Sequence, residues 1–371
     1  MITDLKVKVG PEFYRYHKDA IEFIPELLEE HKAKNILIVH GTISWKKAKV
    51  KMSFLENIDK NIFYHKYTGE CSYYGADMIA KIIKENDIDF VIGVGGGKLV
   101  DVVGYVAHIC NIKYGVVPTL ASNCAPWTPL SVMYKESGEA EGKTEHYMRQ
   151  AIFFITDPYL IIDSPVRYFI AGLADTLAKW YESESILSQK HLHNEPFLNL
   201  ASYTARLCKE SILKYSEKAI KDMQNKIVSD EFIHLSEVVI AIAGLCGGLG
   251  DKYARNSVAH AMHDAISKYI QESHSYLHGE KVAYGILYQL ALEDKWEIID
   301  LLIPLYNNLK LPLCLDDMGI YPKDEKIIDN IVSFINSKEK VHLIPISITP
   351  DLLKRTILNL EKYIKEVRGR E

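Results

Sequence analysis

Residues 90–101, Phe-Val-Ile-Gly-Val-Gly-Gly-Gly-Lys-Leu-Val-Asp, predict a buried strand, a glycine turn and a helix in direct succession. A short apolar run indicates the strand, and apolar residues at helical spacing from Leu99 onward indicate the helix. Glycine has no Cβ, so a ligand can approach the main chain of the turn closely. The helix N-terminus behind the turn offers free N–H groups and a positive dipole end, which suit a phosphate group. The candidate phosphate-binding residues are Gly95, Gly96, Gly97 and Lys98.

The turn matches neither of two familiar phosphate-binding motifs. The P-loop pattern needs a glycine where Ile92 stands and a serine or threonine where Leu99 stands. The dinucleotide fingerprint read from Gly93 needs a glycine where Lys98 stands. A tight strand-to-helix turn that uses small residues only for packing is therefore the alternative interpretation.

Strands alternate with helices through the first part of the chain. A further buried strand is expected at residues 36–39, and other strands are expected at 62–64, 114–117, 132–134 and 151–155. A helix is expected over 18–31, and Ser72 is the candidate N-cap of another helix over 76–85. This alternation predicts βαβ units and a mostly parallel sheet. Ligands of such sheets bind beyond the carboxyl ends of the strands, where His40, Gly95 and Thr119 would lie.

The character of the sequence changes after residue 164, because strand-like runs disappear and helical periodicity continues. The periodic segments are 166–188, 194–214, 232–248, 253–271, 280–308 and 349–367. We therefore expect two domains, an α/β dinucleotide-binding domain over residues 1–163 and an all-helical domain over 164–371. The active site is expected in the cleft between them.

Charge and composition narrow the range of partners. The formal net charge is -5 and no basic run stands out, so nucleic acid is not an expected partner. The chain has no signal-peptide pattern and no run of 18 apolar residues, so no membrane partner is expected. Its six cysteines have no paired spacing, which favours a reduced, cytoplasmic location.

Asp175 stands in residues 171–180, a segment that is apolar at almost every position. Its helix is therefore expected to be buried on most sides. An isolated buried charge is costly, so Asp175 must be paired or bound to a metal ion. Lys179 lies one turn further on the same face, so an Asp175–Lys179 ion pair is the alternative.

Four histidines cluster within 19 residues, at His260, His263, His274 and His278. Spacings of three and four put His260, His263 and Asp264 on one helix face. Imidazole and carboxylate groups are suitable ligands for zinc or ferrous iron, and three protein ligands leave a position open for a substrate. The alternative is a group of partly buried histidines whose hydrogen bonds are satisfied near a loop.

Short motifs that match one enzyme family run along nearly the whole chain. They are Gly69-Glu70-Cys71-Ser72, Gly95-Gly96-Gly97-Lys98 with Asp101, Pro118-Thr119-Leu120-Ala121-Ser122, Ala125-Pro126, Leu130-Ser131-Val132, Pro165-Val166-Arg167, Ala171-Gly172-Leu173-Ala174-Asp175, His260-Ala261-Met262-His263 and His278-Gly279-Glu280-Lys281-Val282-Ala283. By their order and spacing, the chain resembles the iron-containing (group III) alcohol dehydrogenases, and most closely their glycerol dehydrogenase branch.

This resemblance implies the architecture that this family shares with dehydroquinate synthase, in which an α/β nucleotide-binding domain precedes a helical domain. It implies hydride transfer between NAD or NADP and a small polyol or alcohol, in a homo-oligomer. It also implies one divalent metal ion, zinc or iron, bound by Asp175, His260 and His278, with His263 as a further histidine of the site. The implied cofactor-binding residues are Gly95, Gly96, Gly97, Lys98, Asp101, Thr119, Ser122, Thr128, Leu130 and Tyr134.

Two positions depart from the glycerol dehydrogenase pattern. Cys124 stands where that branch has an aspartate that contacts the polyol, and a thiol does not accept hydrogen bonds as a carboxylate does. The physiological substrate is therefore open. The first strand ends in His40-Gly41-Thr42 instead of the acidic residue that holds the adenosine ribose in NAD-preferring relatives, which predicts that NADP is accepted.

Three alternative functions stay open at this point. Lys179 also resembles a lysine of glycerol-1-phosphate dehydrogenases, so the substrate could carry a phosphate. A dehydroquinate synthase-like lyase would share the fold, NAD and the metal, although such enzymes usually have glutamate as first ligand and a lysine three residues later. A non-catalytic nucleotide or metal binder is the third alternative.

Overall fold

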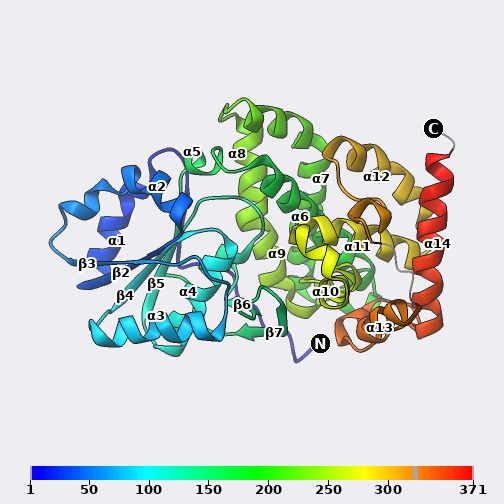
Figure 1. Cartoon of the computed structure of the whole chain (residues 1–371), viewed down its shortest axis with the longest axis horizontal. Helices are drawn as coiled ribbons and strands as arrows, with labels where there is room; N and C mark the ends of the chain where they lie inside the picture. Colours follow the sequence, from blue (N-terminus) through cyan, green and yellow to red (C-terminus); the bar gives the residue numbers. More distant parts are fainter. Residues whose placement is uncertain (1, 321–324, 370–371) are drawn as a thin grey trace. The chain divides into compact units, whose positions relative to one another are not determined.

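The structure, a computed structural model, describes residues 2–320 and 325–369 and comprises two compact units (Figure 1). The sheet unit contains Lys8–Phe169 and Lys218–Leu245. The helical unit contains Met1–Val7, Ile170–Glu217 and Cys246–Glu371. The chain passes from the sheet unit to the helical unit after Phe169, close to the domain boundary expected near Asp163. The two domains expected from the sequence stay a prediction.

Six parallel strands form the main sheet of the sheet unit, in the order β1-β8-β5-β4-β2-β3. They are β1 (Phe13–Tyr16), β2 (Asn35–His40), β3 (Asn61–Lys66), β4 (Phe90–Gly95), β5 (Lys113–Pro118) and β8 (Phe153–Thr156). Strand β4 is buried at every position, as expected for an inner strand covered on both faces. The register pairs His40 with Val94, and Gly95 with Pro118, so the carboxyl ends of β2, β4 and β5 are neighbours. The predicted parallel sheet is confirmed.

Helices cover both faces of this sheet (Figure 1). They are α1 (Ile24–Glu30) and α2 (Thr42–Lys51) on one face, and α3 (Tyr73–Glu85) and α4 (Gly97–Ile109) on the other. Leu28 of α1 packs in one apolar cluster with Ile38 and Ile92 of the sheet. Ser72 caps α3 as predicted, because its Oγ accepts the N–H of Gly75 at 3.0 Å.

Two parts of the sheet unit differ from expectation. The helix expected over residues 18–31 is a 3₁₀ turn, Ala20–Phe23, followed by α1. Pro25 lies in the first turn of α1, the part of a helix where proline's missing N–H is tolerated. The strand β6 (Leu130–Tyr134) was expected, but it pairs antiparallel with β7 (Ala140–His146), which the sequence did not indicate.

The sheet unit also includes α5 (Pro158–Ile161), α8 (Asp230–Glu237) and a π-helical segment, Val238–Ile242. The segment continues into α9 (Ala243–Gly250), where Gly244 lies so close to Trp127 that an added Cβ would approach the Trp127 Cβ to 2.5 Å. The indole Nε1 of Trp127 donates to the carbonyl of Val9 at 2.7 Å. These contacts anchor the loop that follows β5.

One apolar run, Asp230–Tyr253, meets the length and composition expected of a membrane-crossing helix. Within the described residues, 72% of its most apolar window is buried inside the protein, as in the core helix of a folded domain. The run is therefore weak evidence for a membrane span.

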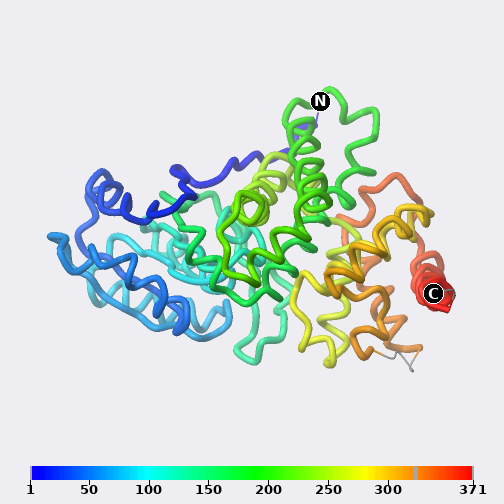
Figure 2. The backbone as a smooth tube through the Cα atoms, turned by 90° about the horizontal axis from the view of Figure 1, so that it is seen from above, coloured from blue at the N-terminus to red at the C-terminus, as the bar shows by residue number. Residues whose placement is uncertain are grey.

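The described part of the helical unit contains no strand, which confirms the helical expectation. Its helices are α6 (Val166–Leu187), α7 (Pro196–Gln224), α9, α10 (Val258–Tyr269), α11 (His278–Leu292), α12 (Trp296–Leu309), α13 (Glu325–Asn336) and α14 (Pro350–Arg368), of which α6, α7 and α9 extend across a unit boundary. Helices α10 and α11 run side by side in both views (Figures 1 and 2). The single helix expected over 280–308 is two helices, α11 and α12, and α13 was not predicted.

Candidate active site

Three helices of the helical unit bring one candidate ligand each to the same point. These are Asp175 on α6, His260 on α10 and His278 at the start of α11. Oδ1 of Asp175 lies 3.1 Å from Nε2 of His260 and 3.3 Å from Nε2 of His278. One donor atom from each residue lies within 4.8 Å of the other two. The structure thus brings together the three residues that the sequence singled out.

This donor set fits a divalent metal ion. Ligand atoms at tetrahedral angles around zinc, each about 2.1 Å from the ion, lie roughly 3.4 Å apart. The separations between Asp175 and the two imidazoles, 3.1 and 3.3 Å, are close to that value. Two imidazoles and one carboxylate are also suitable ligands for zinc or ferrous iron, with positions left open. The geometry and the chemistry of the donors agree.

The charges of this cluster favour a cation. Burial would raise the pKa of Asp175, but hydrogen bonds from His260 and His278 outweigh it and hold the pKa well below its usual value. Burial would lower the pKa of His260, but Glu182 and Asp175 outweigh it and raise the pKa to about 9. Metal ligation needs the unprotonated ring nitrogen, so an ion would compete with a proton at His260.

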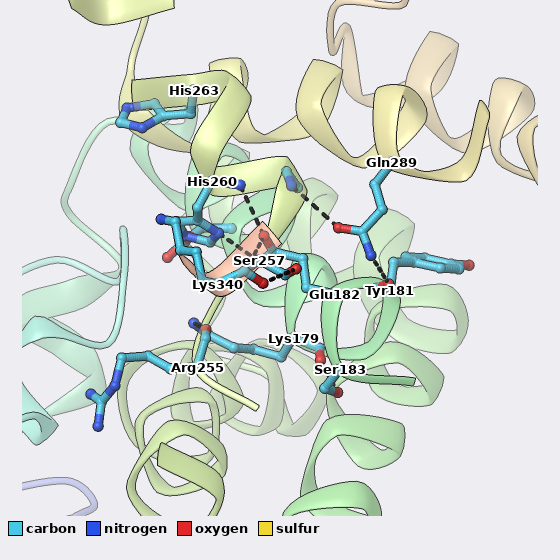
Figure 3. Close-up of polar contacts among 12 residues, drawn as sticks. Lys179, Tyr181, Glu182, Ser183, Arg255, Ser257, His260, His263, Gln289 and Lys340 are labelled. Atoms are coloured by element: carbon cyan, nitrogen blue, oxygen red, sulfur yellow. Dashed lines mark hydrogen bonds and ion pairs between the residues drawn. The ribbon is translucent and has the colours of Figure 1, made fainter. Parts of the chain in front are cut away.

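Glu182 is a residue of this site that the sequence analysis missed. It lies seven residues after Asp175 on α6 and is 2% exposed. Its Oε2 lies 2.6 Å from Nδ1 of His260 (Figure 3), whereas Asp175 faces the other ring nitrogen, Nε2. A spacing of two helical turns from Asp175 was the signal that could have identified it, because such residues share a face.

The other histidines of the cluster are placed differently. His263 is buried beside the ligands, with its ring centroid 4.1 Å from that of His278 and its Nδ1 3.0 Å from Oδ1 of Asp264. Burial and then the charge of His278 lower the pKa of His263 to about 3. His274 is exposed, and its Nε2 lies 3.0 Å from the carbonyl oxygen of Ser267, away from the three ligands.

Lys179 is a buried cation one turn after Asp175. Its ammonium group donates to the carbonyl of Arg255 at 2.8 Å, and the residue is 5% exposed. Its charge also helps to lower the pKa values of Asp175 and Glu182. Lys179 therefore balances the charges of two buried carboxylates. The sequence predicted only one of them, as an ion pair between Asp175 and Lys179.

The glycine turn of the sheet unit has the geometry that the sequence predicted. Gly96 is the N-cap of α4 in an extended conformation, and no side chain caps this helix end. A Cβ on Gly97 would lie 2.9 Å from the side-chain amide of Asn123, closer than real Cβ contacts. The turn and the loop after β5 therefore approach each other as closely as they do only because position 97 is glycine.

The charge of Lys98 has a partner that the sequence did not reveal. Its Nζ lies 2.5 Å from Oε2 and 2.7 Å from Oε1 of Glu70, and 5.4 Å from the ring centroid of Tyr134. Lys98 is more than half exposed, whereas Glu70 is largely covered. The ion pair joins the Gly69-Glu70-Cys71-Ser72 motif to the glycine turn.

Asp101 is buried in α4 and ties the helix to the hairpin. Its Oδ2 accepts the N–H of Val132 at 3.1 Å, and its backbone carbonyl accepts the hydroxyl of Ser131 at 2.6 Å. Its Oδ1 is buried, and no hydrogen-bond partner is found for it among the described residues. Burial raises the pKa of Asp101 to about 8. The carboxyl group is therefore placed for support of the hairpin, and its predicted cofactor contact stays a prediction.

The remaining candidate cofactor-binding residues lie at the end of β5, in the loop after it and in the β6–β7 hairpin. Thr119 is buried and donates its N–H to the carbonyl of Gly95 at 3.1 Å. Ser122 and Cys124 are half-buried in the loop after β5. Three others follow that loop into β6 and its hairpin; they are Thr128, Leu130 and Tyr134. Their contacts with a cofactor stay predictions.

The carboxyl end of β2 lies beside one aromatic and one basic side chain, Trp45 and Lys66. The ring of His40 stacks on Trp45, with centroids 4.8 Å apart. Lys66 of β3 is the register partner of His40. Burial, and to a smaller extent the charge of Lys66, lowers the pKa of His40.

Comparisons with known proteins agree with this fold and identify a family. A sequence model of the iron-containing alcohol dehydrogenases matches residues 11–158. Hydroxycarboxylate dehydrogenase A of Escherichia coli strain K12 is 31% identical over 366 residues, covering 97% of this chain and 98% of that protein. The chain belongs to the iron-containing alcohol dehydrogenase family. Glycerol dehydrogenase of Citrobacter freundii is 28% identical, covering 96% of this chain and 97% of that protein. The crystal structure of a probable glycerol dehydrogenase from Sinorhizobium meliloti 1021 matches with a TM-score of 0.86 at 25% identity, over 98% of this chain and 100% of that one.

This iron-containing alcohol dehydrogenase is an NAD(P)-dependent enzyme that uses one divalent metal ion and acts on an alcohol or polyol. Its fold, an α/β nucleotide-binding part and a helical part, is the one expected from the sequence. The relatives favour this function over the polyol-phosphate and dehydroquinate synthase-like alternatives.

Proposed function

We propose that Asp175, His260 and His278 hold the divalent ion of this dehydrogenase, and that a small polyol or alcohol is oxidised beside it. The observation that supports this most strongly is that donor atoms from three helices lie within 4.8 Å of one another. When bound, the ion acts as a Lewis acid that lowers the pKa of the substrate hydroxyl. The carbon that bears this hydroxyl gives its hydride to the nicotinamide, and the hydroxyl proton leaves to solvent.

We propose that His263 orients, through a hydrogen bond, the water molecule that takes up this proton. Its pKa of about 3 makes it a neutral imidazole at pH 7, and a poor base. A neutral ring can still orient a water molecule, which favours water as the carrier of the hydroxyl proton. Asp264 holds the Nδ1 side of His263 at 3.0 Å, and the hydroxyl of Ser267 lies 3.4 Å from Nε2. Nε2 is the atom assigned to that water, which would share it with Ser267.

The glycine turn is the proposed site for the pyrophosphate of the cofactor. The open N-terminus of α4 supports this, because its first N–H groups have no side-chain cap. The residues proposed to contact the cofactor are Gly95, Gly96, Gly97, Lys98, Asp101, Thr119, Ser122, Thr128, Leu130 and Tyr134.

We propose that NADP is accepted. Residues 40–47 contain no acidic side chain, although NAD-binding sites commonly place one at the end of the second strand to hold the ribose hydroxyls. Lys66 adds a positive charge beside His40, which suits a 2′-phosphate. Equal turnover with NAD at a far lower cofactor concentration would contradict this assignment.

A second candidate substrate class is a small hydroxy acid. Lys179 supports it, because this buried cation lies one turn from Asp175 and could attract a carboxylate. Cys124 also supports it, because the loop has no acid that would repel such a substrate. A similar protein from Escherichia coli is named hydroxycarboxylate dehydrogenase A.

The test is nicotinamide absorbance with metal-reconstituted protein, measured with NAD and with NADP. The panel comprises glycerol, 1,2-propanediol, simple alcohols, 2-hydroxy acids, glycerol 1-phosphate and the matching carbonyl compounds. Turnover that disappears with a chelator and returns with zinc or iron is the expected result. Binding of cofactor without turnover on any compound would favour a non-catalytic binder instead.

A cytoplasmic homo-oligomer is the proposed form of the enzyme. No disulfide joins the six cysteines, all of which lie in the described part of the chain, and this agrees with a reducing compartment. Light scattering after size-exclusion chromatography measures the assembly, and a monomer would contradict the proposal.

A further inference from the structure

Glu182 uses its two carboxylate oxygens for different partners on α10. Oε1 accepts two backbone N–H groups, from Ser257 at 2.6 Å and from His260 at 2.9 Å. Oε2 faces the imidazole Nδ1 of His260 at 2.6 Å (Figure 3). One oxygen thus caps the helix, and among the described residues the other has its hydrogen bond with the ring.

The helix cap alone does not account for this arrangement. The residue that precedes α10, Ser257, makes no side-chain cap, because its hydroxyl donates to the carbonyl of Lys340 at 3.0 Å. Oε1 of Glu182 supplies the missing cap by itself. The second oxygen remains, and it is buried against the ring of a proposed metal ligand.

We propose that Glu182 is the positioning residue of the metal centre, which fixes the ring of His260 so that Nε2 faces the ion. This inference rests on the proposed metal ligands. An ionised carboxylate accepts hydrogen bonds but donates none, so Nδ1 of His260 must carry a hydrogen. In the neutral ring that metal ligation requires, the lone pair then lies on Nε2, the atom that is 3.1 Å from Asp175. Carboxylates that hold metal-binding histidines in this way commonly contribute ten- to a hundredfold to metal affinity.

Gln289 of α11 provides a matched control, because it joins the same helices without touching a ligand ring. Its Oε1 accepts the N–H of Ala259 at 3.2 Å, and its Nε2 donates to the carbonyl of Tyr181 at 2.9 Å (Figure 3). It therefore links α11 to α10 and to α6. Loss of Gln289 weakens the packing of these helices and leaves the contact between Glu182 and His260 in place.

The deciding variant is Glu182→Gln, which has the same shape. Its amide oxygen can keep the two backbone hydrogen bonds made by Oε1. Its NH₂ group then faces Nδ1 of His260, so Nδ1 must accept and the ring hydrogen moves to Nε2. A ring protonated at Nε2 has no lone pair there for a metal ion. The cap survives while the proposed positioning is reversed.

The experiment measures three quantities on wild type, Glu182→Gln and Gln289→Met, each prepared without metal. These are the Tm, the zinc affinity by competition with a chromophoric chelator, and the visible absorption of the cobalt-substituted protein. For Glu182→Gln we expect a Tm near that of wild type, a ten- to hundredfold loss of zinc affinity and an altered cobalt spectrum. For Gln289→Met we expect a lower Tm with zinc affinity and the cobalt spectrum as in wild type.

Wild-type zinc affinity in Glu182→Gln would overturn the inference while leaving the ligand assignment intact. Equal losses of affinity in both variants would also overturn it, because general loosening of the helices would then be the cause. His260→Ala tests the ligand assignment separately. Wild-type zinc affinity in that variant would remove His260 from the ligand set, and the role of Glu182 with it.

Discussion

Asp175 and Glu182 lie two turns apart on one face of α6, and they contact opposite ring nitrogens of the same histidine. Asp175 Oδ1 is 3.1 Å from Nε2 of His260, and Glu182 Oε2 is 2.6 Å from Nδ1. A single helix therefore sets the place of one candidate ligand and the orientation of another. The third, His278, comes from α11, so the geometry depends on how α11 packs against α6 and α10.

Replacing His278 removes one of three candidate ligands. We expect His278→Ala to lose zinc on gel filtration and to reduce kcat/KM by more than about 100-fold, beyond the usual effect of an outer partner. Metal content and steady-state kinetics measure both effects. The control is His274→Ala, in the same histidine cluster but exposed and bonded to the carbonyl of Ser267. Retention of metal and activity by His278→Ala would refute the ligand set.

Replacing Lys179 distinguishes a hydroxy acid from a polyol. If its ammonium group attracts a substrate carboxylate, Lys179→Gln raises KM for a 2-hydroxy acid by about tenfold or more relative to 1,2-propanediol. A hydrogen bond to a charged group contributes roughly 1.5–3 kcal/mol, which supports a change of this size. Steady-state kinetics on both substrates give the comparison. Equal changes for the two would mean that Lys179 serves only its buried neighbours, Asp175 and Glu182.

The coenzyme preference is testable at the end of β2. His40→Asp supplies the missing acid, which repels a 2′-phosphate and can bind ribose hydroxyls. We expect KM for NADP to rise about tenfold or more, equivalent to roughly 1.4 kcal/mol, while KM for NAD falls or stays level. Lys84→Ala changes an exposed residue of α3 and lowers the net charge equally, so it serves as the control. An equal rise of KM for NADP in the control would point to a general charge effect.

The buried carboxyl group of Asp101 predicts a pH-dependent stability. Its pKa is about 8 in the folded protein, because of burial, and ordinarily 3.8. Between these values the folded state holds a proton that the unfolded chain releases, so stability falls as pH rises toward 8. Asparagine keeps an acceptor for the N–H of Val132 and has no charge. We therefore expect Asp101→Asn to raise the Tm only slightly near pH 5 and by several degrees at pH 9.

Thermal unfolding monitored by circular dichroism at the two pH values measures this difference. Asp77→Asn, on the exposed side of α3, is the matched control and is expected to change the Tm little at either pH. The same Tm shift for Asp101→Asn at pH 5 and pH 9 would contradict a raised pKa.

The sequence singled out the residues of the candidate metal site because they carry recognisable chemistry. An aspartate in an apolar helix and histidines at helical spacing indicate a site before any fold is known. Glu182 has only a weak signal, its spacing of two helical turns from Asp175, because a glutamate on a helix is usually solvated. It is buried only because Ser257 and His260, 75 and 78 residues away in sequence, supply three hydrogen-bond donors. The ion pair between Lys98 and Glu70 was missed similarly, because its two residues are 28 positions apart in the sequence.

Helix ends were harder to predict than helices. The apolar period continues from 280 to 308, yet α11 ends at Leu292 and α12 begins at Trp296. The turn between them contains Asp294 at φ 58°, a left-handed conformation that usually signals glycine. Aspartate adopts it here, so no glycine or proline marked the break. Strand β7 was missed similarly, because Ala140–His146 is polar and carries no apolar alternation.

The alternation of the two units along the chain has a consequence for synthesis on the ribosome. The sheet unit is incomplete until Lys218–Leu245 has emerged, and by then Ile170–Glu217 of the helical unit is already outside. The apolar segment Val238–Ile242 must therefore join residues of the sheet unit that left the ribosome much earlier, at a time when the helical unit is still incomplete. A fragment that stops near Asp163 would lack this closing piece. The sheet unit can therefore be completed only after Leu245 has left the ribosome, although Lys8–Phe169 leaves it much earlier.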